Sequence, residues 1–119
     1  MIRFVLAMTF AFSTSVVAQQ AVDVGTGAVL RGLDKVAGDV VDMTLRNGES
    51  ADIGRLTVRL GECRYPEGDP AADAFAFVTV EEQGREAPVF QGWMIASSPA
   101  LNAMEHARYD VWVMRCKTD

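Results

Sequence analysis

Apolar and polar residues alternate along much of this chain, and this pattern limits its possible folds more than any other feature. Strict alternation occurs within residues 39–48, DVVDMTLRNG, and within residues 54–63, GRLTVRLGEC. Successive side chains of a β-strand point to opposite faces of its sheet, so each run predicts a strand with one buried and one exposed face. The pair Asn47-Gly48 is typical of a turn and separates the two strands.

Further segments also have the composition of strands. They are rich in branched aliphatic and aromatic residues, and turn-forming residues separate them. They are AVLRGLDKV (28–36), which Gly32 interrupts, AFAFVTVEE (74–82), PVFQGWMIA (88–96) and YDVWVMRC (109–116). Residues 74–82 are apolar at both alternating positions, which predicts a central strand covered on both faces. We expect RYPEGDPAAD (64–73) to be a surface loop.

One segment has the sequence of a short helix. Ser98 suits the N-cap, Pro99 suits the first helical position, and residues 100–106, ALNAMEH, contain good helix formers. His106 would end this helix, where a protonated imidazole interacts favourably with the helix dipole. The segments together predict an all-β antiparallel domain over residues 28–119. We expect a small sandwich or partly closed barrel of about six strands, with one short helix before the last strand.

The first residues have the order of a secretory signal peptide. A basic residue, Arg3, precedes an apolar run over residues 4–12, and small residues lead to Ala18. We expect residues 1–18 to be cleaved after Ala18, because the apolar run is too short to cross a bilayer as a helix. Residues 19–27 are expected to form a flexible leader. The mature chain is then predicted to be a soluble periplasmic protein with no direct membrane insertion.

The two cysteines, Cys63 and Cys116, are predicted to form one disulfide. Exported proteins fold in an oxidising compartment, where an even number of cysteines normally pairs. This bond would close a loop of about half the mature chain and stabilise the fold by roughly 4 kcal/mol. A catalytic redox pair normally has the closer C-x-x-C spacing, and two cysteines with one histidine make an incomplete zinc site. We therefore expect no metal and no cofactor.

The net charge of the chain excludes some classes of partner. The formal charge is −5 at pH 7, and the basic residues are scattered singly along the chain. Binding to nucleic acid or to an anionic membrane surface depends on clustered Lys and Arg. We therefore expect neither partner.

Four residues could form a hydrolase site if the fold brought them together. Ser97 or Ser98 would be the nucleophile, His106 the base and Asp110 the residue that orients it. The serines lack the G-x-S-x-G turn, and a helix that starts at Ser98 and ends at His106 would separate these residues by roughly 12 Å. The capping chemistry of the helix explains the same spacing, so we predict no catalytic residue.

The aromatic residues around this segment allow two interpretations. Trp93, Tyr109 and Trp112 could form a binding face, because Trp and Tyr combine a large apolar area with a polar group. Alternation along the last strand, however, places Trp112 on the same face as Met114 and Cys116, beside the disulfide. That arrangement favours core packing over a binding surface.

Three stretches carry a family resemblance: LRGLDKVAG, FQGWMIASSPALNAMEH and YDVWVMRC. G-W-M, A-S-S-P, L-x-A-x-E-H and Y-D-V-W-V followed by cysteine come in this order. The chain thus resembles a family of exported alphaproteobacterial proteins known as domain of unknown function 2155, over essentially its whole mature length. The resemblance implies one small exported domain with no assigned activity or cofactor, and a partner in an envelope complex. It directs attention to residues 92–110.

The leading functional hypothesis is a non-catalytic periplasmic module, structural or protein-binding, that associates with an envelope protein, as an accessory to a membrane complex. A small-ligand or glycan-binding β domain is the alternative, and a Ser-His hydrolase ranks third. The candidate binding surface comprises Trp93, Ser97, Ser98, Glu105, His106, Tyr109, Asp110 and Trp112.

Overall fold

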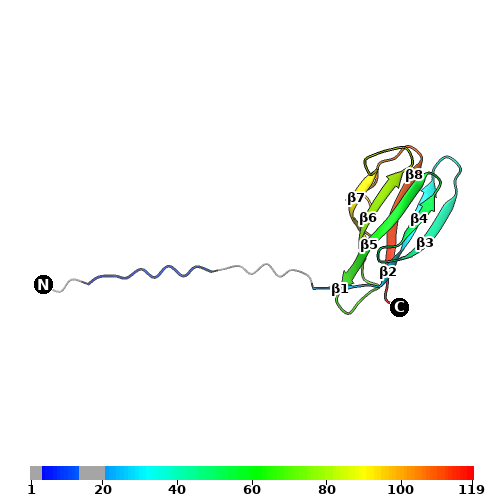
Figure 1. Cartoon of the computed structure of the whole chain (residues 1–119). Helices are drawn as coiled ribbons and strands as arrows, with labels where there is room; N and C mark the ends of the chain where they lie inside the picture. Colours follow the sequence, from blue (N-terminus) through cyan, green and yellow to red (C-terminus); the bar gives the residue numbers. More distant parts are fainter. Residues whose placement is uncertain (1–3, 14–20) are drawn as a thin grey trace.

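Two antiparallel β-sheets pack face to face in this protein (Figure 1). The computed structural model describes residues 4–13 and 21–119. The strands are β1 (Val22–Val24), β2 (Gly27–Asp34), β3 (Val40–Arg46), β4 (Ser50–Ile53), β5 (Leu56–Pro66), β6 (Phe75–Glu82), β7 (Phe90–Ile95) and β8 (Tyr109–Lys117). The first sheet has the order β1-β5-β6-β7, with β4 also paired to β5, and the second has the order β3-β2-β8.

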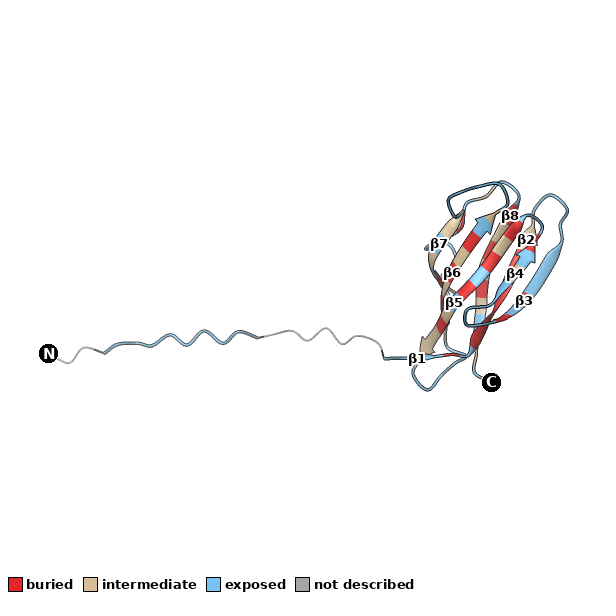
Figure 2. Cartoon of the chain, in the orientation of Figure 1, coloured by how far each residue is buried: buried red, intermediate tan, exposed pale blue. Residues whose placement is uncertain are grey.

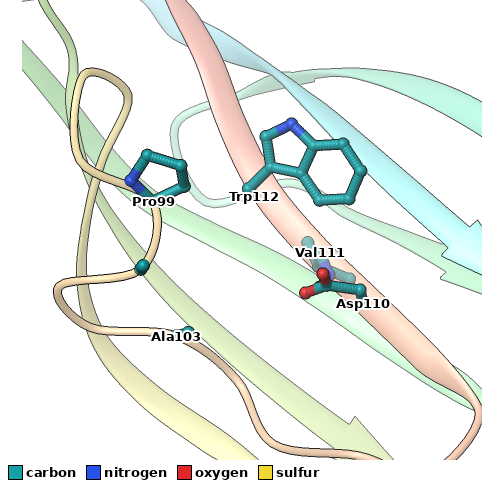
Figure 3. Close-up of a pocket in the computed structure, with 6 residues that line it drawn as sticks. Pro99, Ala103, Asp110, Val111 and Trp112 are labelled. Carbon is teal, nitrogen blue, oxygen red and sulfur yellow. The ribbon is translucent and has the colours of Figure 1, made fainter.

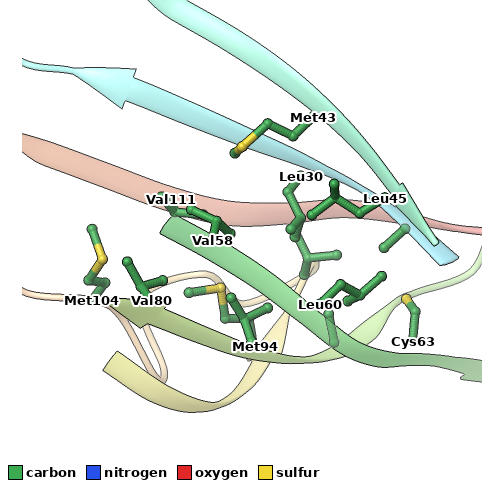
Figure 4. Packing of buried hydrophobic residues seen from close by; sticks show 14 of the residues in the cluster. Leu30, Met43, Leu45, Val58, Leu60, Cys63, Val80, Met94, Met104 and Val111 are labelled. Atoms are coloured by element: carbon green, nitrogen blue, oxygen red, sulfur yellow. The ribbon is translucent and has the colours of Figure 1, made fainter. Parts of the chain in front are cut away.

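The hydrophobic core lies between the two sheets and follows the alternation of the sequence. Buried residues alternate with half-buried or exposed ones along β6 and the first half of β5 (Figure 2), and the buried ones face the other sheet (Figure 4). Each branched aliphatic side chain buried there contributes about 1.5–3 kcal/mol relative to an exposed one. The most deeply buried are Leu30, Leu56, Val58, Leu60, Val78, Val80 and Val113.

A disulfide joins the two sheets. Cys63 of β5 and Cys116 of β8 are bonded, with their Cα atoms 5.6 Å apart, which confirms the predicted pair. The register between β2 and β8 shifts at Met114, since Leu30 lies opposite Val113 while Val29 lies opposite Arg115. This bulge turns Cys116 towards the core.

The same bulge corrects one sequence prediction. Simple alternation put Trp112 on the same face as Cys116, but the extra residue at Met114 reverses the alternation after Val113. Val111, Val113 and Cys116 are buried in the core, and Trp112 faces away from it. Trp112 is therefore not packed beside the disulfide.

The predicted fold class is confirmed, and two of its details are corrected. The protein is an all-β antiparallel sandwich and is not closed into a barrel. The described residues contain eight strands where about six were expected. β4 was missed because it has only four residues, and residues 64–66 extend β5 instead of starting a loop.

The N-terminal part of the described domain also differs from expectation. Residues 22–24 were expected to belong to a flexible leader, yet they form β1 and pair with residues 64–66 of β5. The backbone N–H of Gly25 also donates to the carbonyl of Cys63. The cleavage site predicted after Ala18, and residues 19 and 20 of the leader, lie outside the described residues.

The predicted helix over residues 98–106 is wrong. Residues 96–108, here called the crossing loop, form turns on the path from β7 in the first sheet to β8 in the second. A helix this short is marginal without tertiary support. In the loop Met104 is buried in the core instead, and the Asn102 side-chain amide donates to the Trp93 carbonyl. Within residues 4–13 and 21–119 no helix has the length and apolar character needed to cross a membrane.

Candidate binding surfaces

The serines of the hydrolase hypothesis have partners other than His106. The Ser97 hydroxyl donates to Oδ2 of Asp73 over 2.7 Å, and the Ser97 backbone N–H donates to Oδ1 of the same residue. Burial raises the pKa of Asp73, but hydrogen bonds from the Ser97 side chain and from backbone N–H groups outweigh it and lower that pKa. These two hydrogen bonds to Asp73 fix the position of Ser97 and give its hydroxyl a structural role. Ser98 is exposed, and its backbone takes part in turns.

Both ring nitrogens of His106 are also occupied. Nδ1 accepts hydrogen bonds from the backbone N–H groups of Arg108 and Tyr109, at 3.0 and 3.1 Å. Because Nδ1 is an acceptor, Nε2 carries the proton and donates to Glu82 over 2.8 Å. That hydrogen bond lowers the pKa of Glu82. In the described residues neither serine hydroxyl is bonded to His106, so this arrangement positions the loop and does not resemble a nucleophile with its base.

The other residues predicted for the binding surface lie in three different parts of the structure. Tyr109 is buried in the core, and Glu105 is exposed on the crossing loop. Asp110 and Trp112 are half-buried on the outer face of β8. The Asp110 carboxylate accepts from the backbone N–H of the next residue, Val111.

An apolar patch, here called the Trp93 face, lies on the outer surface of the first sheet. Trp93 of β7 is 37% exposed and points away from the core. Its ring meets Phe77 of β6 edge-on, with centroids 5.4 Å apart, and the Arg64 guanidinium lies 5.0 Å from the Trp93 ring centre. A shallow hollow of about 310 Å³ opens beside these residues. The Trp93 face comprises Phe77 and the residues that line the hollow, Val22, Arg64, Phe75, Trp93 and Ile95.

The sequence of β5 makes room for this patch. β5 bulges at Gly61, and a side chain there would press on the Phe77 ring. Arg64, four-tenths exposed, is paired with Glu62 over 2.6 Å, so its charge is balanced while its planar group covers the indole.

The other half of the same sheet face is polar, with Thr57, Arg59, Thr79 and Gln91 around a separate hollow. The outer face of the sheet is therefore divided into an aromatic half and a polar half.

A second concave surface, here called the Trp112 groove, lies between the crossing loop and β8 (Figure 3). Its volume is about 370 Å³. The loop wall consists of Pro99 and two alanines, and the β8 wall presents the Trp112 indole and the Asp110 carboxylate. The lining residues are Pro99, Ala100, Ala103, Asp110, Val111 and Trp112.

With this geometry in place, comparison with known proteins gives a family. The family model described as "Uncharacterized protein conserved in bacteria (DUF2155)" matches residues 28–116. The chain belongs to this family. The match confirms the family resemblance predicted from the motifs.

An uncharacterised protein of Rickettsia prowazekii (strain Madrid E) is 28% identical to this DUF2155 chain over 94 residues. The aligned region covers 76% of this chain and 61% of the relative, so the chain spans about three-fifths of that protein's length. No solved structure matches this chain.

In this DUF2155 domain the two tryptophans do not form one surface. Trp93 lies on the outer face of the first sheet, and Trp112 lies on the outer face of the second, so the hydrophobic core separates them. The surface predicted around both residues is thus divided into the Trp93 face and the Trp112 groove. His106 and Tyr109 contribute to the position of the loop and to the core, and line neither hollow.

Sequence reasoning missed most of the Trp93 face. Phe75 and Phe77 were interpreted as one side of a strand covered on both faces, but in the described structure no element covers that side of β6. The signal was present in the sequence: a small antiparallel sandwich has only two layers, so a strand that is apolar on both faces must expose one of them. Arg64 and Val22 had been placed in a loop and a leader.

Proposed function

We propose that this chain is a non-catalytic interaction module of the bacterial cell envelope, and that it binds a partner protein through the Trp93 face. The observation that carries the proposal is the position of Trp93, which is 37% exposed on a sheet face that also presents Phe75, Phe77 and Ile95. A contiguous aromatic patch on a small domain is typical of a protein-binding surface. Tryptophan and arginine together are the side chains most enriched at the energetic centres of interfaces.

The chemistry of the predicted catalytic residues supports a binding role. Ser97 is bonded to Asp73 and His106 to Glu82, so each polar group already has a structural partner. Within residues 4–13 and 21–119, no group of three or more His, Cys, Asp or Glu side chains is placed to hold a metal ion. A docking function requires none of these chemistries.

Export to the periplasm belongs to the same proposal. Its support is the charged, apolar and small-residue order of residues 1–18, together with the Cys63–Cys116 disulfide, which suits an oxidising compartment. An accessory role in a membrane complex would place the Trp93 face against an envelope protein.

A small-ligand or glycan-binding function is the second candidate, and one observation favours it. The hollow of about 310 Å³ beside Trp93 combines an aromatic ring with the charged side chain of Arg64, which is itself paired with Glu62. Sites for small molecules combine apolar walls with a few polar groups in this way. The hollow is shallow and open, which suits a protein surface better than an enclosed ligand.

Site-specific photo-crosslinking in intact cells tests the proposal. A photoreactive phenylalanine analogue is placed at Ile95 in the Trp93 face, and at Arg59 on the polar half of the same sheet as the control. We expect Ile95 to capture one envelope protein that Arg59 does not. Trp93→Ala should abolish capture, whereas Trp112→Ala on the opposite sheet should preserve it.

Equal capture from both positions, or capture that survives Trp93→Ala in a folded protein, would contradict a docking role for this face. Protection of the Trp93 fluorescence by a soluble sugar or metabolite, without any protein crosslink, would instead favour the ligand-binding candidate. Circular dichroism and an intact disulfide establish that each variant is folded.

A further inference from the structure

One strand at the edge of the second sheet is open to solvent along its length. β3 pairs with β2 on one side only, and its register with β2 is regular over all seven residues. Five of these seven residues are exposed, among them Val40 at 58% and Val41 at 43%, and Figure 2 shows the strand along the outer edge of the sandwich. An exposed strand edge is a template to which another strand can add.

The hydrogen bonds at the two ends of the β2–β3 ladder show which backbone groups of β3 face this edge. The N–H of Asp34 donates to the carbonyl of Asp39, and the N–H of Asn47 donates to the carbonyl of Thr26. Backbone groups alternate in direction along a strand, so the odd-numbered residues of β3 direct theirs towards β2. The even-numbered residues direct theirs away from the sheet.

Most of these outward backbone groups have no partner. Arg46 is the exception, because its N–H donates to the Glu49 carboxylate and its carbonyl accepts from the Glu49 N–H in the following turn. β4 comes directly after this turn but pairs with β5 in the other sheet, so it does not cover β3. Within the described part of the chain, three residues of β3 therefore have unbonded N–H and C=O groups: Val40, Asp42 and Thr44.

The other strand edges of the described domain are covered or short. Along β8, Tyr109, Val111 and Val113 are at most 3% exposed, so that edge is buried. The crossing loop lies over the edge of β7, where the Asn102 side chain donates to the Trp93 carbonyl. β1 and β4 have only three and four residues. β3 is thus the long edge that a further strand can reach.

The charges along β3 complement those of a second β3 strand in antiparallel orientation. Asp42 is paired with Arg31 of β2 over 2.8 Å, whereas the Arg46 guanidinium has no carboxylate partner within the described residues. If Thr44 lies opposite Thr44 of the partner subunit, each Asp42 lies opposite the partner's Arg46. Directly opposed charges of opposite sign stabilise a sheet, and like charges destabilise it. A register centred on Asp42 would instead place two carboxylates opposite each other.

We propose that this chain forms a two-fold symmetric dimer in which β3 pairs antiparallel with β3 of a second copy. The two three-stranded sheets then join into one continuous sheet across the dimer. Such an interface uses the same surface on both copies, so it closes at two subunits. The Trp93 face lies on the other sheet and remains exposed in both copies, so this inference does not depend on the proposed function.

The pairing gives partners to groups that lack them in the single chain. The N–H and C=O groups of Thr44 bond to those of the partner's Thr44. Those of Asp42 bond to the partner's Arg46, whose N–H exchanges the Glu49 carboxylate for a backbone carbonyl. Each Asp42 carboxylate then lies between Arg31 of its own chain and Arg46 of the partner subunit.

Cysteine crosslinking tests the register. In the proposed dimer the Cα atoms of the two Thr44 residues are about 5.5 Å apart, within the range that a disulfide spans. Thr44→Cys in the full chain should therefore form a covalent dimer on mild oxidation. Val40→Cys on the same strand is the matched control. Val40 is highly exposed, but its two copies would be roughly 26 Å apart, so it should crosslink far less.

Sedimentation equilibrium of the full chain, with its native disulfide intact, tests the backbone and charge pairing. Thr44→Pro removes an N–H that faces away from β2, so the domain should stay folded while dimerisation is lost. Arg46→Glu turns two attractive cross-strand pairs into repulsive ones and should weaken the dimer about tenfold. Arg59→Glu makes the same charge change on the first sheet and should leave dimerisation unchanged.

Three results would each overturn the proposal. The first is a wild-type chain that stays monomeric at millimolar concentration, which would leave the edge of β3 to a strand from another protein. The second is equal crosslinking of Thr44→Cys and Val40→Cys. The third is a dimer that Arg46→Glu weakens no more than Arg59→Glu does. Circular dichroism establishes that each variant is folded, and if Thr44→Pro is not, the crosslinking and charge variants decide.

Discussion

Nε2 of His106 lies 2.8 Å from a carboxylate oxygen of Glu82, and this contact ties the crossing loop to the end of β6. Nδ1 of the same ring accepts the backbone N–H groups of Arg108 and Tyr109, which begin β8. One side chain thus fixes the path of the loop and the start of the last strand. The chain's single histidine serves the architecture of the domain.

Replacing His106 should therefore destabilise the fold. His106→Ala leaves a part-buried backbone N–H without its acceptor, which costs about 1–3 kcal/mol. His106→Asn is the matched control, because its side-chain oxygen can occupy the position of Nδ1 and restore the acceptor. Urea unfolding followed by tryptophan fluorescence measures both variants, and equal stability of His106→Ala and the wild type would contradict the assignment.

The disulfide should account for a large part of the stability. Cys63→Ala with Cys116→Ala removes a bridge across a sequence separation of 53 residues and should lower the free energy of unfolding by roughly 4 kcal/mol. Guanidinium unfolding of the oxidised protein, the reduced protein and the double variant measures the difference. If reduction leaves the unfolding midpoint unchanged, the bridge does not constrain the unfolded chain as inferred.

Asp34 should make the protein less stable in acid. Hydrogen bonds from Arg108 and from the backbone lower the pKa of Asp34 from 3.8 to about 2. Its stabilising effect is therefore complete above the unfolded value of 3.8, and it is lost as the pH falls through about 2. Asp34→Asn should flatten this part of the pH profile of unfolding. An unchanged profile in the variant would assign the acid sensitivity to other carboxyl groups.

Gly54 should tolerate no side chain. Its φ is +55°, and a Cβ atom there would overlap the Tyr109 hydroxyl, which is fixed in the core. Gly54→Ala should cost more than about 2 kcal/mol, because backbone strain and a steric clash add. Gly38→Ala is the matched control, with φ of +78° but open space around it, and should cost about 1 kcal/mol. Thermal unfolding compares the two, and equal losses would mean that the contact with Tyr109 is relieved.

Local pattern was enough to predict the longer strands, but not the short strands β1 and β4 or the register of β8. The alternation through Met43 and Leu45 matches β3, because one face of that strand is buried and the other is exposed. The bulge at Met114 inserts one residue into β8 without a clear signal in the sequence, so the orientation of Trp112 could not be predicted from alternation alone.

The candidate site was located only in part for a related reason. Ser98 and Pro99 have good helix-capping chemistry, but the segment must connect two sheets and bury Met104, and these tertiary contacts decide its conformation. Trp93 was identified as a candidate from its residue type. Except for Ile95, its neighbours on the Trp93 face come from β1, β5 and β6, so the sheet pairing is needed to bring them together.

The Cys63–Cys116 bond also determines how this domain carries mechanical load. A pull applied to the chain before Cys63 and after Cys116 passes across the bridge, so the covalent segment from residue 64 to residue 115 carries none of the tension. That shielded segment contains β6, β7, the crossing loop and most of β8. Both hollows, with Trp93 and Trp112, are formed mainly from it. While the disulfide is intact, stretching the chain can detach the strands before Cys63 from their sheets. The segment that supplies most of the Trp93 face and the Trp112 groove then bears no tension.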